Sequence, residues 1–134
     1  MSFINKLSIV FAVVAAVIEG WIVQNEFFGQ NLTGNPLMTY VPLLGSFGTA
    51  LLCAATAYGL SRRRKWAFNT GVAAAAISIL AFLYHVYFFS VEFLGPDGKP
   101  FINGVELAIA LWPFFVLPLI FVVLLSLQRN ELTD

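Results

Sequence analysis

The chain has 134 residues, of which 60% are hydrophobic and only 10% are charged, and its formal net charge is zero. Soluble domains carry roughly a quarter charged residues, so this composition excludes an ordinary soluble protein. The balanced charge also excludes a basic nucleic-acid-binding surface. A single cysteine, Cys53, excludes an intrachain disulfide, a thiol redox pair and a cysteine-based zinc site. We therefore expect an integral membrane protein.

Four long apolar segments follow one another, at residues 4–28, 37–61, 66–91 and 102–127. Each is long enough to cross a hydrocarbon core of about 30 Å as a helix, and lone strands cannot satisfy their backbone polar groups in lipid. The breaks are short, which makes sequential helices antiparallel neighbours. The sequence therefore predicts an all-α membrane protein, a single domain over 1–134 in which four transmembrane helices form an up-down-up-down bundle.

Positive charge is distributed unequally among the breaks. Lys6 lies near the first end, residues 62–65 are four consecutive basic residues, and Arg129 follows the fourth segment, whereas the other two breaks contain only Lys99. Because short basic loops stay in the cytoplasm, both termini and residues 62–65 are predicted to be cytoplasmic. We interpret the basic run mainly as a topology signal, with an anionic-lipid site as the alternative. The alanine-rich spans and minimal loops favour a prokaryotic inner membrane.

Small residues recur at spacings of three and four in the first three segments. In lipid, helices associate through such small-residue faces, so we expect these faces to meet. By segment they are Ala12, Ala15, Ala16, Glu19 and Gly20; Gly45, Thr49, Leu52, Thr56 and Gly59; and Gly71, Ala74, Ser78, Ala81 and His85. In the fourth segment, Pro113 and Pro118 each lack a backbone donor, which predicts a kinked or loosened helix.

Three ionisable residues lie inside the predicted spans, Glu19, His85 and Glu106, and all three fall in the outer half. Such residues are functional candidates because they are costly in lipid. Glu19 is the strongest, since a carboxyl this deep needs a cation, a strong donor or a proton. Because Glu19 and His85 follow small-residue faces, we expect them to share one interior pocket that opens outward. Further polar and aromatic candidates in that layer are Gln24, Tyr84, Tyr87 and Trp112.

Each candidate also has a plain structural explanation. Glu106 complements a helix dipole if it lies near a helix N-terminus, and His85 can be a neutral imidazole bonded to the backbone or to a tyrosine. Tyr84, Tyr87 and Trp112 can belong to an interfacial aromatic belt. Two carboxylates and one histidine match the composition of an iron or manganese centre. Their spacing follows no metal motif, so we expect neither a metal nor a cofactor.

Three short stretches carry a family resemblance: residues 55–60 (ATAYGL), Lys65-Trp66, and residues 112–118 (WPFFVLP). They resemble the EXPERA family of emopamil-binding-protein-like sterol isomerases and receptors. The resemblance implies a four-helix core with cytoplasmic termini and an intramembrane pocket, lined by acidic residues, for sterols or cationic amphiphiles. The acidic residues of that family's first outer loop and second helix have no counterpart here, so no catalytic residue is transferred.

These observations predict a small integral membrane protein that binds a small amphiphilic, lipid-like or cationic ligand in an outward-facing pocket. Glu19 would supply charge or a proton, His85 would adjust its protonation, and aromatic residues would pack the apolar body. Two alternatives remain open: an accessory or structural subunit of a larger membrane complex, and a homo-oligomeric proton-coupled transporter. The sequence has no Ser-His-Asp arrangement within the spans and no phosphate-binding loop, so we favour a non-enzymatic role.

Overall fold

The computed structural model describes residues 2–28, 36–87, 95–99 and 104–133, apart from the side chains of residues 25–28, 36–40, 42 and 85. The helices are α1 (Phe3–Phe28), α2 (Pro36–Ser61), α3 (Trp66–Tyr87), α4 (Gly104–Ala110), α5 (Pro113–Leu127) and a short 3-10 helix, η2 (Arg129–Glu131). Three stretches are long and apolar enough to cross a membrane, at Phe3–Gln24, Leu43–Ser61 and Trp66–Tyr84, and α5 is a shorter apolar helix. The predicted all-α fold with long apolar helices is confirmed.

The fourth predicted helix, 102–127, is divided into two. Helix α4 ends at Ala110 and α5 begins at Pro113, after a turn at Leu111 and Trp112. Pro113 has no N–H to donate to the carbonyl of Ile109, and it occupies the first turn of α5, where a missing N–H has little cost. Pro118 lies inside α5 without ending it. Pro113 therefore accounts for the break, whereas α5 continues through Pro118.

The other predicted boundaries agree closely with the structure. Helices α1 and α2 each begin one residue before the predicted start and end where predicted, and α3 begins at Trp66 as predicted. The predicted continuation of α3 from 88 to 91 lies outside the described residues. Long uninterrupted apolar runs thus define the first three helices.

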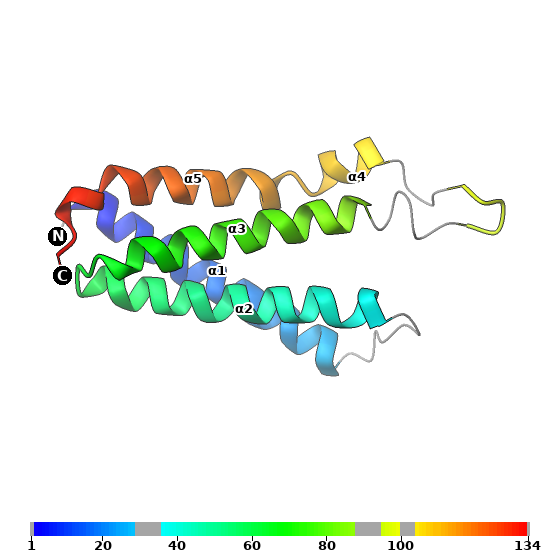
Figure 1. Cartoon of the computed structure of the whole chain (residues 1–134), viewed down its shortest axis with the longest axis horizontal. Coiled ribbons are helices and arrows are strands. Elements are labelled where there is room, and N and C mark those ends of the chain that lie inside the picture. Colours follow the sequence, from blue (N-terminus) through cyan, green and yellow to red (C-terminus); the bar gives the residue numbers. More distant parts are fainter. Residues whose placement is uncertain (1, 29–35, 88–94, 100–103, 134) are drawn as a thin grey trace.

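The long helices run in alternating directions; α2, α3 and α5 lie roughly along one axis, and α1 crosses them obliquely (Figure 1). Helix α1 packs on α2, α2 on α3, and α3 on α5, and a smaller contact joins α1 to α5. Both termini and the turn between α2 and α3 lie at one end, which we call the terminal end (Figure 1). There the N–H of Lys65 donates to the carbonyl of Thr133 at 2.8 Å. The hydroxyl of Ser2 donates to the carboxylate of Glu131 at 2.8 Å. The basic turn and both termini therefore share one end, as their charge pattern requires.

Close packing at the terminal end follows from the small residues of α2 and α3. A Cβ added to Gly59 would lie 2.7 Å from the Cβ of Ala67, and one added to Gly71 would collide with Leu125. The hydroxyl oxygens of Thr56 and Thr70 lie 2.9 Å apart between α2 and α3. The core in the described part of the chain gathers here, and its buried members are Ala12, Ala57, Leu60, Ala67, Phe121, Leu125 and Leu132.

Candidate functional site

Helices α1 and α5 touch at the terminal end. The amide of Gln128, which follows α5, donates to the hydroxyl of Ser8 at 2.7 Å. One turn further along α1, the rings of Phe11 and Phe121 stack with centroids 5.4 Å apart and planes 5° apart. Beyond this point α1 crosses the bundle obliquely and passes toward the outer side of α2 (Figure 1). The two helices therefore diverge with distance from the termini.

A cavity of about 420 Å³ occupies the space between the diverging helices. We call it the groove. It is lined by α1, α2, α3 and α5, through Leu7, Val10, Phe11, Val14, Ala15, Ile18, Glu19, Thr49, Cys53, Ala74, Ala75, Ser78, Pro113, Phe114, Leu117, Pro118 and Phe121. Its back wall consists of small buried residues such as Thr49, Cys53 and Ala74. Residues on its two edges are exposed, including Val14 at 51% and Leu117 at 42%. The groove thus opens sideways between α1 and α5.

Glu19 gives the groove a single acidic position. It is half-buried, and it is the one carboxylate among the described lining residues. The other lining residues with polar side-chain atoms are Thr49, Cys53 and Ser78, which come from α2 and α3. Pockets of 300–1,000 Å³ with apolar walls and a few polar groups are typical small-molecule sites. The groove combines a long apolar wall with a single acid among its described lining residues.

The break between α4 and α5 borders this groove. Pro113, Phe114 and Pro118 all line it. Proline at 118 has no N–H for the carbonyl of Phe114, just as Pro113 has none for Ile109. The N–H of Val116 donates to the carbonyl of Trp112 at 2.9 Å, which restores helical bonding after the break. Irregular backbone beside a cavity is a recurrent feature of ligand and ion sites in membrane helices.

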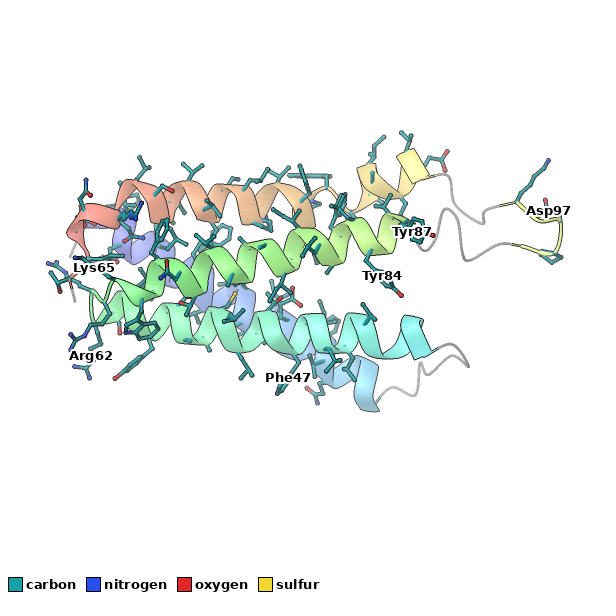
Figure 2. The ribbon with its side chains drawn as sticks, in the orientation of Figure 1. Phe47, Arg62, Lys65, Tyr84, Tyr87 and Asp97 are labelled. Carbon is teal, nitrogen blue, oxygen red and sulfur yellow. The ribbon has the colours of Figure 1, made fainter. Side chains whose placement is uncertain are left out.

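Most of the other predicted site residues lie away from the groove lining. Gln24 and Glu106 are exposed, Trp112 is 55% exposed and Tyr87 is 53% exposed. Tyr84 is half-buried, and both tyrosines lie toward the end of α3 that is far from the termini (Figure 2). Glu106 falls in the first turn of α4, where a carboxylate complements the helix dipole. None of these five is among the described residues that line the groove.

Two predictions about the pocket concern undescribed parts of the chain. The side chain of His85 lies outside the described residues, so the predicted contact between Glu19 and His85 stays a prediction. The predicted outer breaks, 29–36 and 92–101, lie largely outside the described residues, so the predicted outward opening stays a prediction. Among described residues, no group of three or more His, Cys, Asp or Glu side chains comes together as a metal site would require.

A buried polar cluster at the terminal end was not predicted from the sequence. Asn5, Ser8 and Gln128 are at most 2% exposed. The side chain of Asn5 donates to the carbonyl of Leu60 at 3.3 Å. The signal in the sequence is the small-residue face of α1, because Asn5 and Ser8 continue it backward from Ala12 at spacings of three and four. Gln128 directly follows Leu127, the last residue of α5, where a polar residue is common. Nothing in the neighbouring sequence therefore indicates that its side chain is buried.

Comparison with protein-family models, with curated proteins and with solved structures found no match for this chain. The groove, its single carboxylate and the charge distribution are therefore the observations from which a function can be argued. Each belongs to residues that the structure describes. The groove is the most informative of the three because its volume and its lining residues are both known.

Proposed function

We propose that this chain is an integral membrane protein that binds a small amphiphilic, cationic or lipid-like molecule in the groove beside Glu19. The observation that supports this most is the 420 Å³ cavity with one carboxylate among its described lining residues. A hydrocarbon body would pack against the side chains of α1 and α5. A cationic or hydrogen-bond-donating head would bind near Glu19, because an intramembrane carboxylate gains most from a compensating charge or donor.

In this proposal the fourth apolar segment also crosses the membrane. Helix α5 has 15 residues, which at 1.5 Å per residue span about 22 Å, less than the hydrocarbon core. The added length of α4 and the intervening turn makes up the difference. The break would then lie within the membrane, where the neighbouring helices and the groove surround it. Discontinuous spans of this kind are compatible with a bilayer because protein covers the irregular backbone.

The proposed ligand enters from the bilayer, between α1 and α5. Exposed apolar side chains form both edges, among them Val10, Val14 and Phe114. An amphiphile dissolved in the membrane can slide along such edges without leaving its apolar surroundings. Toward the terminal end, the stacked Phe11 and Phe121 rings are part of the groove lining.

Binding can be tested with two probes that share a twelve-carbon chain, dodecylamine and dodecanol. Native mass spectrometry of the detergent-extracted protein would report how much of each stays bound. We expect the wild-type protein to retain the amine at least severalfold better than the alcohol, because only the amine brings a cation to Glu19. Glu19→Gln keeps the size of the side chain but removes its charge, so the preference should fall to near one without a lower melting temperature.

Matched variants make this result specific. Glu106→Gln removes a carboxylate that is exposed on α4 and does not line the groove, so it should leave the amine preference unchanged. Glu19→Leu should also abolish the preference for dodecylamine, and this variant should retain dodecanol at least as strongly as the wild-type protein does. Wild-type retention of the amine by both Glu19 variants would contradict the proposed role of this residue.

Topology is tested separately with cysteine variants on a Cys53→Ser background. A membrane-impermeant maleimide added from outside should label Gly98→Cys and not Ser61→Cys, because the basic turn that follows Ser61 is placed in the cytoplasm by this proposal. The reverse pattern would overturn the orientation, and equal labelling of the two positions would overturn the crossing of the membrane by α3. The mass of the extracted particle separates the other candidates: a heteromeric complex favours an accessory subunit, and a small symmetric oligomer favours a transporter.

A further inference from the structure

A second cavity lies at the terminal end, between the start of α3 and the segment that follows α5. Its volume is about 740 Å³, and it is lined by Lys65, Trp66, Phe68, Asn69, Arg129, Asn130 and Leu132. It shares no lining residue with the groove. Figure 2 shows Lys65 beside the C-terminal segment, whereas Arg62 lies near the end of α2. The cavity is thus a separate site on the basic end of the molecule.

Tertiary contacts hold the two walls of this cavity together. The N–H of Lys65 donates to the carbonyl of Thr133 at 2.8 Å, and the N–H of Thr133 donates to the carbonyl of Arg63 at 2.6 Å. Arg129 places its guanidinium 4.9 Å from the centre of the Phe68 ring, which is cation–π distance. Leu132 is 3% exposed and anchors the C-terminal wall in the core. Two cations from distant parts of the sequence therefore border one cavity.

The side chains that line this cavity are suited to an anion. Lys65 and Arg129 supply charge, and the amides of Asn69 and Asn130 supply further donors. No carboxylate is among the described lining residues. Guanidinium groups form paired hydrogen bonds to phosphate oxygens, and an ammonium adds a mobile point charge. A phosphate group is the anion that these donors fit best.

An apolar track beside the cavity favours a phosphate that belongs to a lipid. Asn69 lies on an exposed face of α3 that continues through Ala76, Leu80 and Leu83, at spacings of seven, four and three. Leu80 is 64% exposed and Leu83 is 51% exposed, so this face can lie against an acyl chain. Trp66, 41% exposed, is a residue type that concentrates at membrane interfaces. We propose that this cavity binds a phosphate group, supplied by the headgroup of an anionic membrane lipid whose chain lies along α3.

The test uses protein extracted from membranes of equal parts phosphatidylglycerol and phosphatidylcholine with identical acyl chains. Native mass spectrometry would count the retained molecules of each lipid. Removing both cations of the cavity, in Lys65→Gln with Arg129→Gln, should lower phosphatidylglycerol retention roughly tenfold, since two charge-assisted contacts are lost. The matched control is Lys6→Gln with Arg62→Gln, which removes two exposed charges outside the cavity. It should change retention less than twofold.

Several outcomes would overturn the proposal. If both double variants lose phosphatidylglycerol equally, the basic end attracts anionic lipid without a defined site. If neither variant loses it, the cavity does not bind the lipid. Glycerol phosphate, which lacks acyl chains, tests the source: if it displaces phosphatidylglycerol at low millimolar concentration, the lipid assignment fails. The single variant Arg129→Gln should keep the wild-type melting temperature and still lose phosphatidylglycerol severalfold. It therefore tests the proposal even if the double variant does not fold, and unchanged retention in it would overturn the proposal.

Discussion

Helices α1 and α5 are in contact at one end and separated by a groove further along, and the difference shows what small residues do in this bundle. At the terminal end, Gly71 of α3 lies against Leu125, and Phe121 stacks on Phe11. In the groove, the equally small Ala74 and Ala75 face a cavity. Small residues permit close approach, but they do not by themselves bring two helices together, because the crossing angle also decides whether the space is filled.

Polar groups differ between the two regions in the same way. At the terminal end, Gln128 and Ser8 bond to each other, and Asn5 bonds to the carbonyl of Leu60. The oxygens of the Asn5 and Gln128 amides have no hydrogen-bond partner within the described part, so this cluster contributes modestly. In the groove, Glu19 borders a cavity. The polar groups of the terminal end therefore join neighbouring helices, whereas Glu19 lies at the edge of a cavity.

The largest expected effect comes from adding a methyl group at the closed end. Gly71→Ala should lower the free energy of unfolding by about 2 kcal/mol, because the new Cβ overlaps Leu125 and crowds Thr56. Gly20→Ala is the matched control, since nothing lies within 4 Å of its added Cβ. Reversible unfolding in mixed detergent micelles measures both. Equal stability of the two variants would mean that the terminal end is not closely packed.

A smaller loss is expected from the polar cluster. Ser8→Ala removes the acceptor of the Gln128 amide and should cost about 1 kcal/mol, in line with hydrogen bonds between membrane helices. Ser126→Ala is the comparison, because that exposed hydroxyl donates only to the carbonyl of Val122 in its own helix. The same unfolding assay should detect no change there. A neutral Ser8→Ala variant would mean that the bond between Gln128 and Ser8 does not contribute to the stability of this end.

Filling the groove should affect binding more than folding. Ala15→Leu adds three carbons to a lining residue of α1, so dodecylamine retention should fall about fivefold while stability changes by less than about 0.5 kcal/mol. Ala76→Leu places the same side chain on an exposed position of α3, outside the groove. It should retain the amine like the wild-type protein. Unchanged retention by Ala15→Leu would place the binding site elsewhere.

The smallest effect concerns the break at the edge of the groove. Pro113→Ala supplies an N–H to the carbonyl of Ile109, so the helix can continue from α4 into α5. Hydrogen exchange of the Trp112 and Phe114 amides should slow roughly threefold, because local opening becomes less favourable. Pro118→Ala, inside the unbroken part of α5, should leave these two amides unchanged. Faster exchange in Pro113→Ala would show that the proline stabilises the turn.

The sequence by itself predicted the helical elements well because long apolar runs and helix-breaking residues are local signals. Residues 4–28, 37–61 and the start at Trp66 were recognised from composition alone, and Pro113 and Pro118 indicated a weakness in the fourth segment. Which proline breaks the helix was not predictable, since both remove one donor. Packing decides where the helix breaks. Pro118 is buried within α5, beside the groove, and the helix continues through it, whereas the break immediately precedes Pro113.

Tertiary structure decided the shape and neighbours of the candidate site. Periodicity correctly indicated that Ala74, Ser78 and Thr49 face inward, yet it carries no information on the angle at which α1 crosses the bundle. That angle separates α1 from α5 and places Glu19 beside Cys53 and Ser78 on one cavity. Charge along the chain determined that the termini and the basic turn share an end. The joining of Lys65 and Arg129 at one cavity required the folded C-terminal segment, because contacts between residues this far apart in the chain exist only after the helices have packed.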